Sequence, residues 1–223
     1  MQVRFPPGTP GARIDNPIAP HSLMPSSSAN SRLPYVGLSL LFVVALVWRG
    51  LAPAHPSLAN SVPLAAMCFG GAFFCGRHWW WVPAFLLLST DAALTLFAGN
   101  PPSLFTLGSA LFFLGAAWLG SRRPASLGPL QAWLLMLGGS LATCVIFYGL
   151  ANTSAWALMP EYPKSLAGWW QSQTIGLPGP YPPALAFLRN ALVGNTVWCL
   201  LAGGVLLWRH RTAEASNAAM AAA

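Results

Sequence analysis

Asp91 is the residue of this sequence whose chemistry is least expected at its position. It is a carboxylate inside the apolar run WWWVPAFLLLSTDAALTLFAG, which contains no other acid. A charged side chain at the centre of a membrane helix costs about 2.5 to 3.5 kcal/mol on insertion scales, so it normally faces a charged partner, a cavity or a ligand. We therefore expect Asp91 to point into the interior of a membrane protein.

Depth along the apolar stretches suggests a partner for Asp91. At 1.5 Å per helical residue, Asp91 lies about 10 Å below the outer end of stretch 79–98, and Arg189 about 8 Å below the outer end of stretch 184–208. We predict that both face the same interior region, either as a clamp between helices or as the floor of an outward-facing ligand cavity. Three further polar residues are expected in this region: Asn190, Asn195 and, nearer the rim, Arg49.

A second group of candidates lies in the long segment ANTSAWALMPEYPKSLAGWWQSQTIGLPGPYPP, which separates the last two apolar stretches. Long loops of this kind are often lids or binding loops. The alternative is a passive amphipathic segment on the membrane surface. Residues 165–173 are expected to form a short interfacial helix. The ligand-binding candidates of the segment are Tyr162, Trp169, Trp170 and Gln171.

The composition indicates the class of protein that positions these residues. Hydrophobic residues make up 55% of the 223 residues and charged residues only 7%, which is typical of a polytopic integral membrane protein embedded in a lipid bilayer. The formal net charge is +7, but the basic residues stand singly between apolar stretches. A nucleic-acid site would gather them into one patch, so we expect no nucleic-acid partner.

Six apolar stretches have lengths near the roughly 20 residues that cross a bilayer core of about 30 Å. The second is short, so it must thin the bilayer, use its polar flanks or be shielded by neighbours. The sequence therefore predicts an all-α fold, a six-helix transmembrane domain over residues 34–208. The stretches are 34–49, 62–74, 79–98, 104–120, 130–150 and 184–208.

The basic residues also predict the orientation of the chain in the membrane. With a cytoplasmic N-terminus, eight basic residues lie inside and three outside, as the positive-inside rule favours. Residues 1–33, rich in Pro, Ser and Gly, are expected to be a disordered cytoplasmic tail, and residues 209–223 a frayed one. The inner residues are Arg4, Arg13, Arg32, Arg77, Arg122, Arg123, Arg209 and Arg211, and the outer ones are Arg49, Lys164 and Arg189.

The four cysteines show no CxxC spacing, so neither a zinc site nor a disulfide is indicated, and we expect buried small side chains. One exception stays open, a single thiolate that ligates a soft metal centre of a bound molecule, for which Cys68 and Cys75 are candidates. His55 is a lone external histidine. No catalytic triad, HExxH or phosphate-binding loop appears, so we expect neither an enzyme nor a cofactor.

Several ordered segments carry a resemblance to a known family. They are NSVPLAAMCFGGAFF after Arg49, LLLSTD ending at Asp91, NTSAW, EYPKSLAGWW and FLRNALVGN. Together they resemble an uncharacterised family of bacterial six-span membrane proteins. That family in turn resembles the substrate-binding S-components of energy-coupling-factor vitamin transporters, which have six helices, cytoplasmic termini and an outward-facing pocket.

The resemblance implies matching positions and some departures. The matches are Asn60, Pro63, Asp91, Tyr162, Pro163, Lys164, Gly168, Arg189, Asn190 and Gly194, and they add Asn60 to the ligand-binding candidates. Asn195 stands where the family pattern has aspartate. The first stretch lacks the AxxxA ridge by which S-components dock on a membrane partner.

These observations predict a substrate-binding component of membrane transport for a small molecule, with a vitamin or a cobalamin-like compound as the class that the resemblance implies. The alternative is a non-catalytic structural or assembly subunit of a larger membrane complex, held by membrane-protein partners. The eleven tryptophans at helix ends and in the long segment fit either function.

Overall fold

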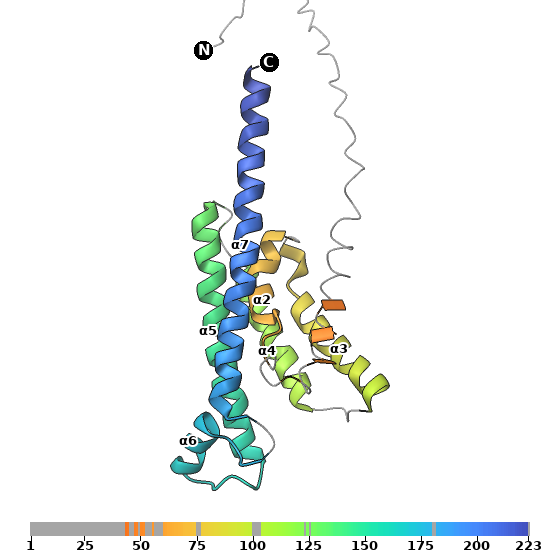
Figure 1. Cartoon of the computed structure of the whole chain (residues 1–223), viewed down its shortest axis with the longest axis vertical. Helices are drawn as coiled ribbons and strands as arrows, with labels where there is room; N and C mark the ends of the chain where they lie inside the picture. The colour runs from red at the N-terminus through yellow and green to blue at the C-terminus, as the bar shows by residue number, and fades with distance from the viewer. Residues whose placement is uncertain are drawn as a thin grey trace, which may run out of the picture. The chain divides into compact units, whose positions relative to one another are not determined.

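The structure of the chain is a computed structural model (Figure 1) that describes residues 43–44, 47–48, 50–51, 55, 60–74, 77–99, 104–122, 124, 126–179 and 182–222. The chain divides into the units Met1–Arg32 and Leu33–Ala223, and every described residue belongs to the second. The expected tail 1–33, most of the stretch 34–49, Arg49 and Cys75 lie outside the described residues.

Every described element of secondary structure is a helix, so the all-α class is confirmed for this part of the chain (Figure 1). One element, η3, is a short 3-10 helix, and the others are α-helices. The elements are α2 (Leu64–Phe74), η3 (Arg77–Trp79), α3 (Val82–Ala98), α4 (Leu104–Ser121), α5 (Pro129–Leu158), α6 (Leu166–Thr174) and α7 (Ala184–Ala222).

Three of these helices are long and apolar enough to cross a membrane, over Leu104–Ser121, Pro129–Leu158 and Ala184–Val205, and Val82–Phe97 is a shorter apolar helix. Hydrophobic side chains on these helices are widely exposed, Leu111 at 67% and Val193 at 59% among them. Such exposure is consistent with a membrane protein, where lipid covers the outer faces.

The short second stretch forms helix α2, and neighbouring helices surround it. At 1.5 Å per residue the 11 residues of α2 span only about 16 Å, and α2 packs against α3, α4, α5 and α7. Its residues Leu64, Ala65, Ala66 and Cys68 are all buried. This packing agrees with shielding by neighbours, one of the three expected alternatives.

The fifth stretch extends beyond the boundary expected at residue 150, because α5 continues to Leu158. Polar side chains in its last turns bond back to the preceding turn: Asn152 Nδ2 donates to the carbonyl of Tyr148 at 2.9 Å, and Ser154 Oγ to that of Leu150 at 2.8 Å. These bonds are compatible with helix, so the loss of hydrophobicity after Leu150 did not end it. At about 45 Å, α5 is longer than a bilayer core.

The last stretch also continues further than expected. The C-terminal segment was expected to be frayed, but α7 runs on as a helix to Ala222. The reason is local, because alanine has the highest helix propensity and this segment contains many alanines. Its described side chains are exposed, Trp208 at 65% and Met220 at 69%.

Candidate functional site

The two charges predicted as partners lie on helices α3 and α7, which share the neighbour α2. Asp91 is half-buried on α3, which packs against α2 and α4, whereas Arg189 lies in the second turn of α7, which packs against α2, α5 and α6. Arg189 Nη2 donates to Oδ1 of the adjacent Asn190 at 3.3 Å, and Asn190 is buried. A direct contact between Asp91 and Arg189 stays a prediction.

Asn195 has a clear structural role in the N-terminal half of α7. Its Oδ1 accepts from the backbone N–H of Ala66 at 2.9 Å, and its Nδ2 donates to the carbonyl of Ala191 at 2.9 Å. Ala66 is the third residue of α2, so its N–H has no acceptor within its own helix. A side chain of α7 thus caps the first turn of α2.

The backbone around this cap is packed at very close range. A Cβ built on Gly194 would lie 2.7 Å from Cβ of Ser61 and 2.9 Å from its carbonyl oxygen. Trp198 Nε1 donates to the same carbonyl at 3.2 Å, while Trp48 Nε1 donates to Ser61 Oγ at 2.7 Å. The segments NSVP and FLRNALVGN are far apart in sequence, but they pack directly against each other in the structure.

The long segment contains a compact hydrogen-bonded structure, which we call the α5–α6 cap: the last turns of α5, residues 159–165, and α6. The helix expected over 165–173 is observed as α6, with Ser165 Oγ accepting from the N–H of Gly168 at 3.2 Å. Lys164 Nζ donates to the carbonyl of Met159 at 2.6 Å and to that of Trp156. An ammonium at the end of α5 also complements the helix dipole.

Side chains of the cap tie α6 to the flank of α5. Trp169 Nε1 donates to Thr153 Oγ1 at 3.0 Å, and Gln173 Nε2 donates to the same oxygen at 3.2 Å. The hydroxyl of Tyr148 donates to the carbonyl of Gln173. Trp156 Nε1 closes the turn by donating to the carbonyl of Pro163 at 2.9 Å.

Tyr162 lies inside the cap rather than on its surface, with 5% of its area exposed. Burial, and to a lesser extent the neighbouring Glu161 carboxylate, raises the pKa of the Tyr162 phenol. A Cβ built on Gly168 would lie 2.0 Å from the carbonyl oxygen of Pro163, so the YPKSLAG turn folds tightly on itself.

The predicted ligand-binding residues of the long segment thus have different surroundings. Tyr162 is buried, Trp169 is bonded to Thr153, and Gln171 Nε2 donates to the carbonyl of Gly176 at 3.1 Å. Trp170 is 62% exposed. Asn60 and His55 are exposed, and Asn60 has a left-handed backbone with φ of 62°, which asparagine tolerates.

Three of the four cysteines are described, and all three are buried with free thiols, as the sequence predicted: Cys68, Cys144 and Cys199. Each thiol lies close to an oxygen of another helix, for example Cys199 Sγ at 3.5 Å from Ser140 Oγ. No group of three or more His, Cys, Asp or Glu residues that could hold a metal ion occurs among the described residues.

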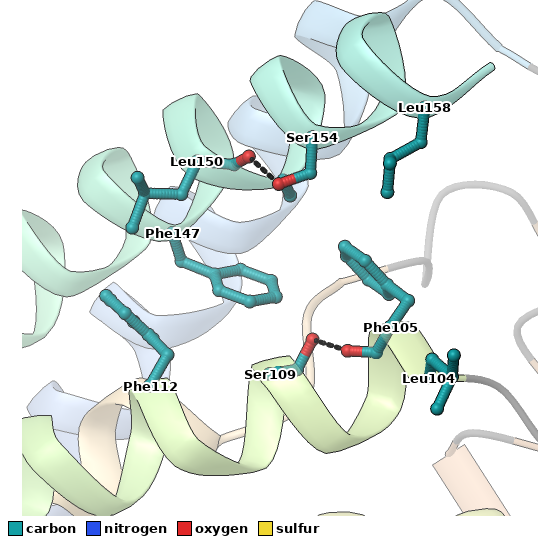
Figure 2. Close-up of a pocket in the computed structure, with 10 residues that line it drawn as sticks. Leu104, Phe105, Ser109, Phe112, Phe147, Leu150, Ser154 and Leu158 are labelled. Atoms are coloured by element: carbon teal, nitrogen blue, oxygen red, sulfur yellow. Dashed lines mark hydrogen bonds between the residues drawn. The ribbon is translucent and has the colours of Figure 1, made fainter.

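A cavity of about 410 Å³ opens between α4 and α5, and we call it the α4–α5 cavity (Figure 2). None of its ten lining residues carries a charge. Phe105 and Phe112 enter it from α4 and Phe147 from α5, as Figure 2 shows. Ser154 and Leu158 also line it, and they belong to the last turns of α5, which form one part of the α5–α6 cap.

Sequence reasoning missed this cavity. Its phenylalanines lie in apolar stretches, where they look the same as lipid-facing or core residues. No spacing rule distinguishes a ring that faces a void from one that faces a packed neighbour. The role of Lys164 was missed for a related reason, since the carbonyls it binds become a helix end only once α5 is known to reach Leu158.

The family of unknown function DUF6580 matches residues 29–216, which is most of the chain. No curated protein sequence matches the chain, and no solved structure does.

Proposed function

The chain belongs to the DUF6580 family, and from this premise and the geometry above we propose that it is a small-molecule-binding component of membrane transport. One observation carries the proposal, the α4–α5 cavity beside the α5–α6 cap. Its volume of about 410 Å³ lies within the 300 to 1,000 Å³ usual for small-molecule sites, which are mostly apolar. A non-enzymatic binding function fits these surroundings.

We further propose a bundle of six membrane spans in a bacterial inner membrane, with both termini cytoplasmic and the cap outside. The excess of basic residues assigned to the cytoplasmic side supports this orientation. The resemblance to S-components of energy-coupling-factor transporters supports an outward-facing site and a vitamin-like substrate. In this proposal Asp91 and Arg189 lie outside the uncharged lining of the α4–α5 cavity and act as a clamp between helices.

Untargeted analysis of spent growth medium tests transport even though the substrate is unidentified. Cells that overproduce the chain should deplete at least one small molecule from complex medium faster than cells carrying an empty vector. Asp91→Ala and Arg189→Ala should slow that depletion several-fold at equal membrane abundance, because a clamp between helices needs both charges. Leu111→Ala, on an exposed face of α4, is the matched control and should deplete like wild type.

One observation favours the alternative, a structural or assembly subunit. The helix α7 continues beyond Val205 to Ala222 with exposed side chains, which is a shape suited to contact with a partner protein. If the spent medium is unchanged by overproduction while affinity purification recovers stoichiometric membrane-protein partners, transport is contradicted and the subunit function is favoured.

A further inference from the structure

We infer that the α4–α5 cavity binds a neutral aromatic molecule that carries a hydrogen-bond donor, a class that includes phenols and indoles. The inference rests on the proposed small-molecule function and names its ligand class and its place in the fold. Three properties of the cavity carry it: its aromatic wall, its two hydroxyl acceptors and its uncharged lining.

The aromatic wall is formed by rings from both helices. The centroid of Phe147 on α5 lies 6.3 Å from that of Phe105 and 5.3 Å from that of Phe112, both on α4, and the ring planes are tilted by 47° and 39°. The Phe105 side chain is 53% exposed. Tilted rings at these spacings offer a guest ring the edge-to-face and offset contacts that aromatic pairs prefer.

The polar groups of the cavity are serine hydroxyls, one on each helix. Ser109 Oγ donates to the carbonyl of Phe105 at 2.8 Å, and Ser154 Oγ donates to that of Leu150 at 2.8 Å, as Figure 2 shows. Each proton is therefore already engaged, whereas a hydroxyl oxygen keeps lone pairs that can accept. A matching ligand supplies an N–H or O–H donor.

The uncharged lining and the access to the cavity restrict the class of ligand further. An ionised ligand would lose hydration without gaining a counter-charge in this uncharged lining, a large cost in an apolar site. Leu104 and Leu158, at the rim, are 88% and 82% exposed and begin α4 and end α5. Both helices are candidate spans, so a neutral aromatic molecule that partitions into a bilayer has a route to a cavity between them.

The test is equilibrium dialysis of radiolabelled indole against the full-length chain in detergent. Wild type should bind indole saturably, and Phe105→Ala and Phe147→Ala should bind it about tenfold more weakly, the order of magnitude expected from losing one aromatic contact and its burial. Phe97→Ala is the matched control, because Phe97 on α3 is 88% exposed and lies outside the cavity lining. It should bind like wild type.

Competing ligands test the two hydroxyl acceptors and the uncharged lining. Benzothiophene, which lacks the N–H donor, should compete several-fold less well than indole, and Ser109→Ala combined with Ser154→Ala should remove that difference. Benzoate should compete least. Equal binding by wild type and the two cavity variants would overturn the inference. Competition by octanol as strong as that by indole would also overturn it, and would assign the cavity to a lipid chain.

Indole binding and depletion of the growth medium, measured on the same variants, distinguish failure of the cavity assignment from failure of the proposed transport function. If overproduction depletes a medium component and Phe105→Ala does not slow the depletion, the proposed function stands and the place assigned to the ligand is wrong. If indole binds saturably and is lost in Phe105→Ala, but no medium component is depleted, the cavity assignment stands and the transport function is wrong.

Discussion

Asn195 shows why a polar side chain is retained within an apolar stretch of α7. In hydrocarbon no water is present to bond the free N–H groups at the start of a helix, and each unsatisfied group costs several kcal/mol. Asn195 provides one of the acceptors that α2 needs, the one for Ala66, and only 2% of its area is exposed. An aspartate at this position would offer the same acceptor.

We predict that Asn195→Leu lowers the free energy of unfolding by about 1 to 3 kcal/mol, the cost of leaving a buried donor unsatisfied. Asn195→Asp should retain more stability than Asn195→Leu, because a carboxylate is also favoured at a helix N-terminus. Thermal unfolding in detergent measures both. Thr196→Val is the control, since the Thr196 hydroxyl bonds the carbonyl of Leu192 in its own helix. Equal loss in the leucine and aspartate variants would contradict the capping role.

Residue types alone located some of the polar positions but not their partners. The sequence predicted Asn195 and Tyr162 as ligand contacts. In the structure, Asn195 accepts a hydrogen bond from the first turn of α2, and Tyr162 is buried within the α5–α6 cap. An amide or a phenol has the same chemistry toward a ligand as toward its own backbone. The contact of Asn195 with Ala66, which is 129 residues away, is visible only in the structure.

At the scale of elements, the short helix α2 depends on contacts that longer helices do not need. Its first turn receives Asn195, and the carbonyl of Ala65 accepts from Ser140 Oγ at 3.1 Å. The approach of α7 to the chain just before α2 requires glycine at position 194, where a Cβ would lie 2.8 Å from Cα of Ser61.

We predict that Gly194→Ala destabilises the protein by about 1 to 3 kcal/mol, because the backbones must separate to admit the methyl group. Gly204→Ala is a matched control on the same helix, with no atom within 4 Å of the added carbon. It should be neutral or stabilising by up to about 1 kcal/mol, from helix propensity. Denaturant titration of both variants checks the prediction, and similar losses at the two glycines would refute the close packing of α7 on Ser61.

Hydrophobic pattern predicted the interiors of the elements well and their ends poorly. Residues 104–120 agree with α4 to one residue, because an apolar run and a helix coincide there. The ends of α5 and α7 were placed too early, because Asn152, Ser154 and the C-terminal alanines continue a helix after hydrophobicity has fallen.

At the scale of the whole molecule, composition was sufficient for the all-helical class and for helices of membrane-spanning length. Six spans and their orientation stay predictions that rest on the apolar stretches and the basic residues. The cavity could not be predicted at all, since a void depends on how two helices diverge rather than on which residues they contain. Among the described residues, many polar side chains bond the backbone of the bundle itself, and the α4–α5 cavity is the site that we propose for a ligand.

Native mass spectrometry of the full-length chain purified in detergent tests the central claim, small-molecule binding, most directly. We predict a population with an added mass of one small molecule, present in wild type and in Phe97→Ala and reduced in Phe105→Ala. Only the apo mass in wild-type protein from several growth media would contradict the claim.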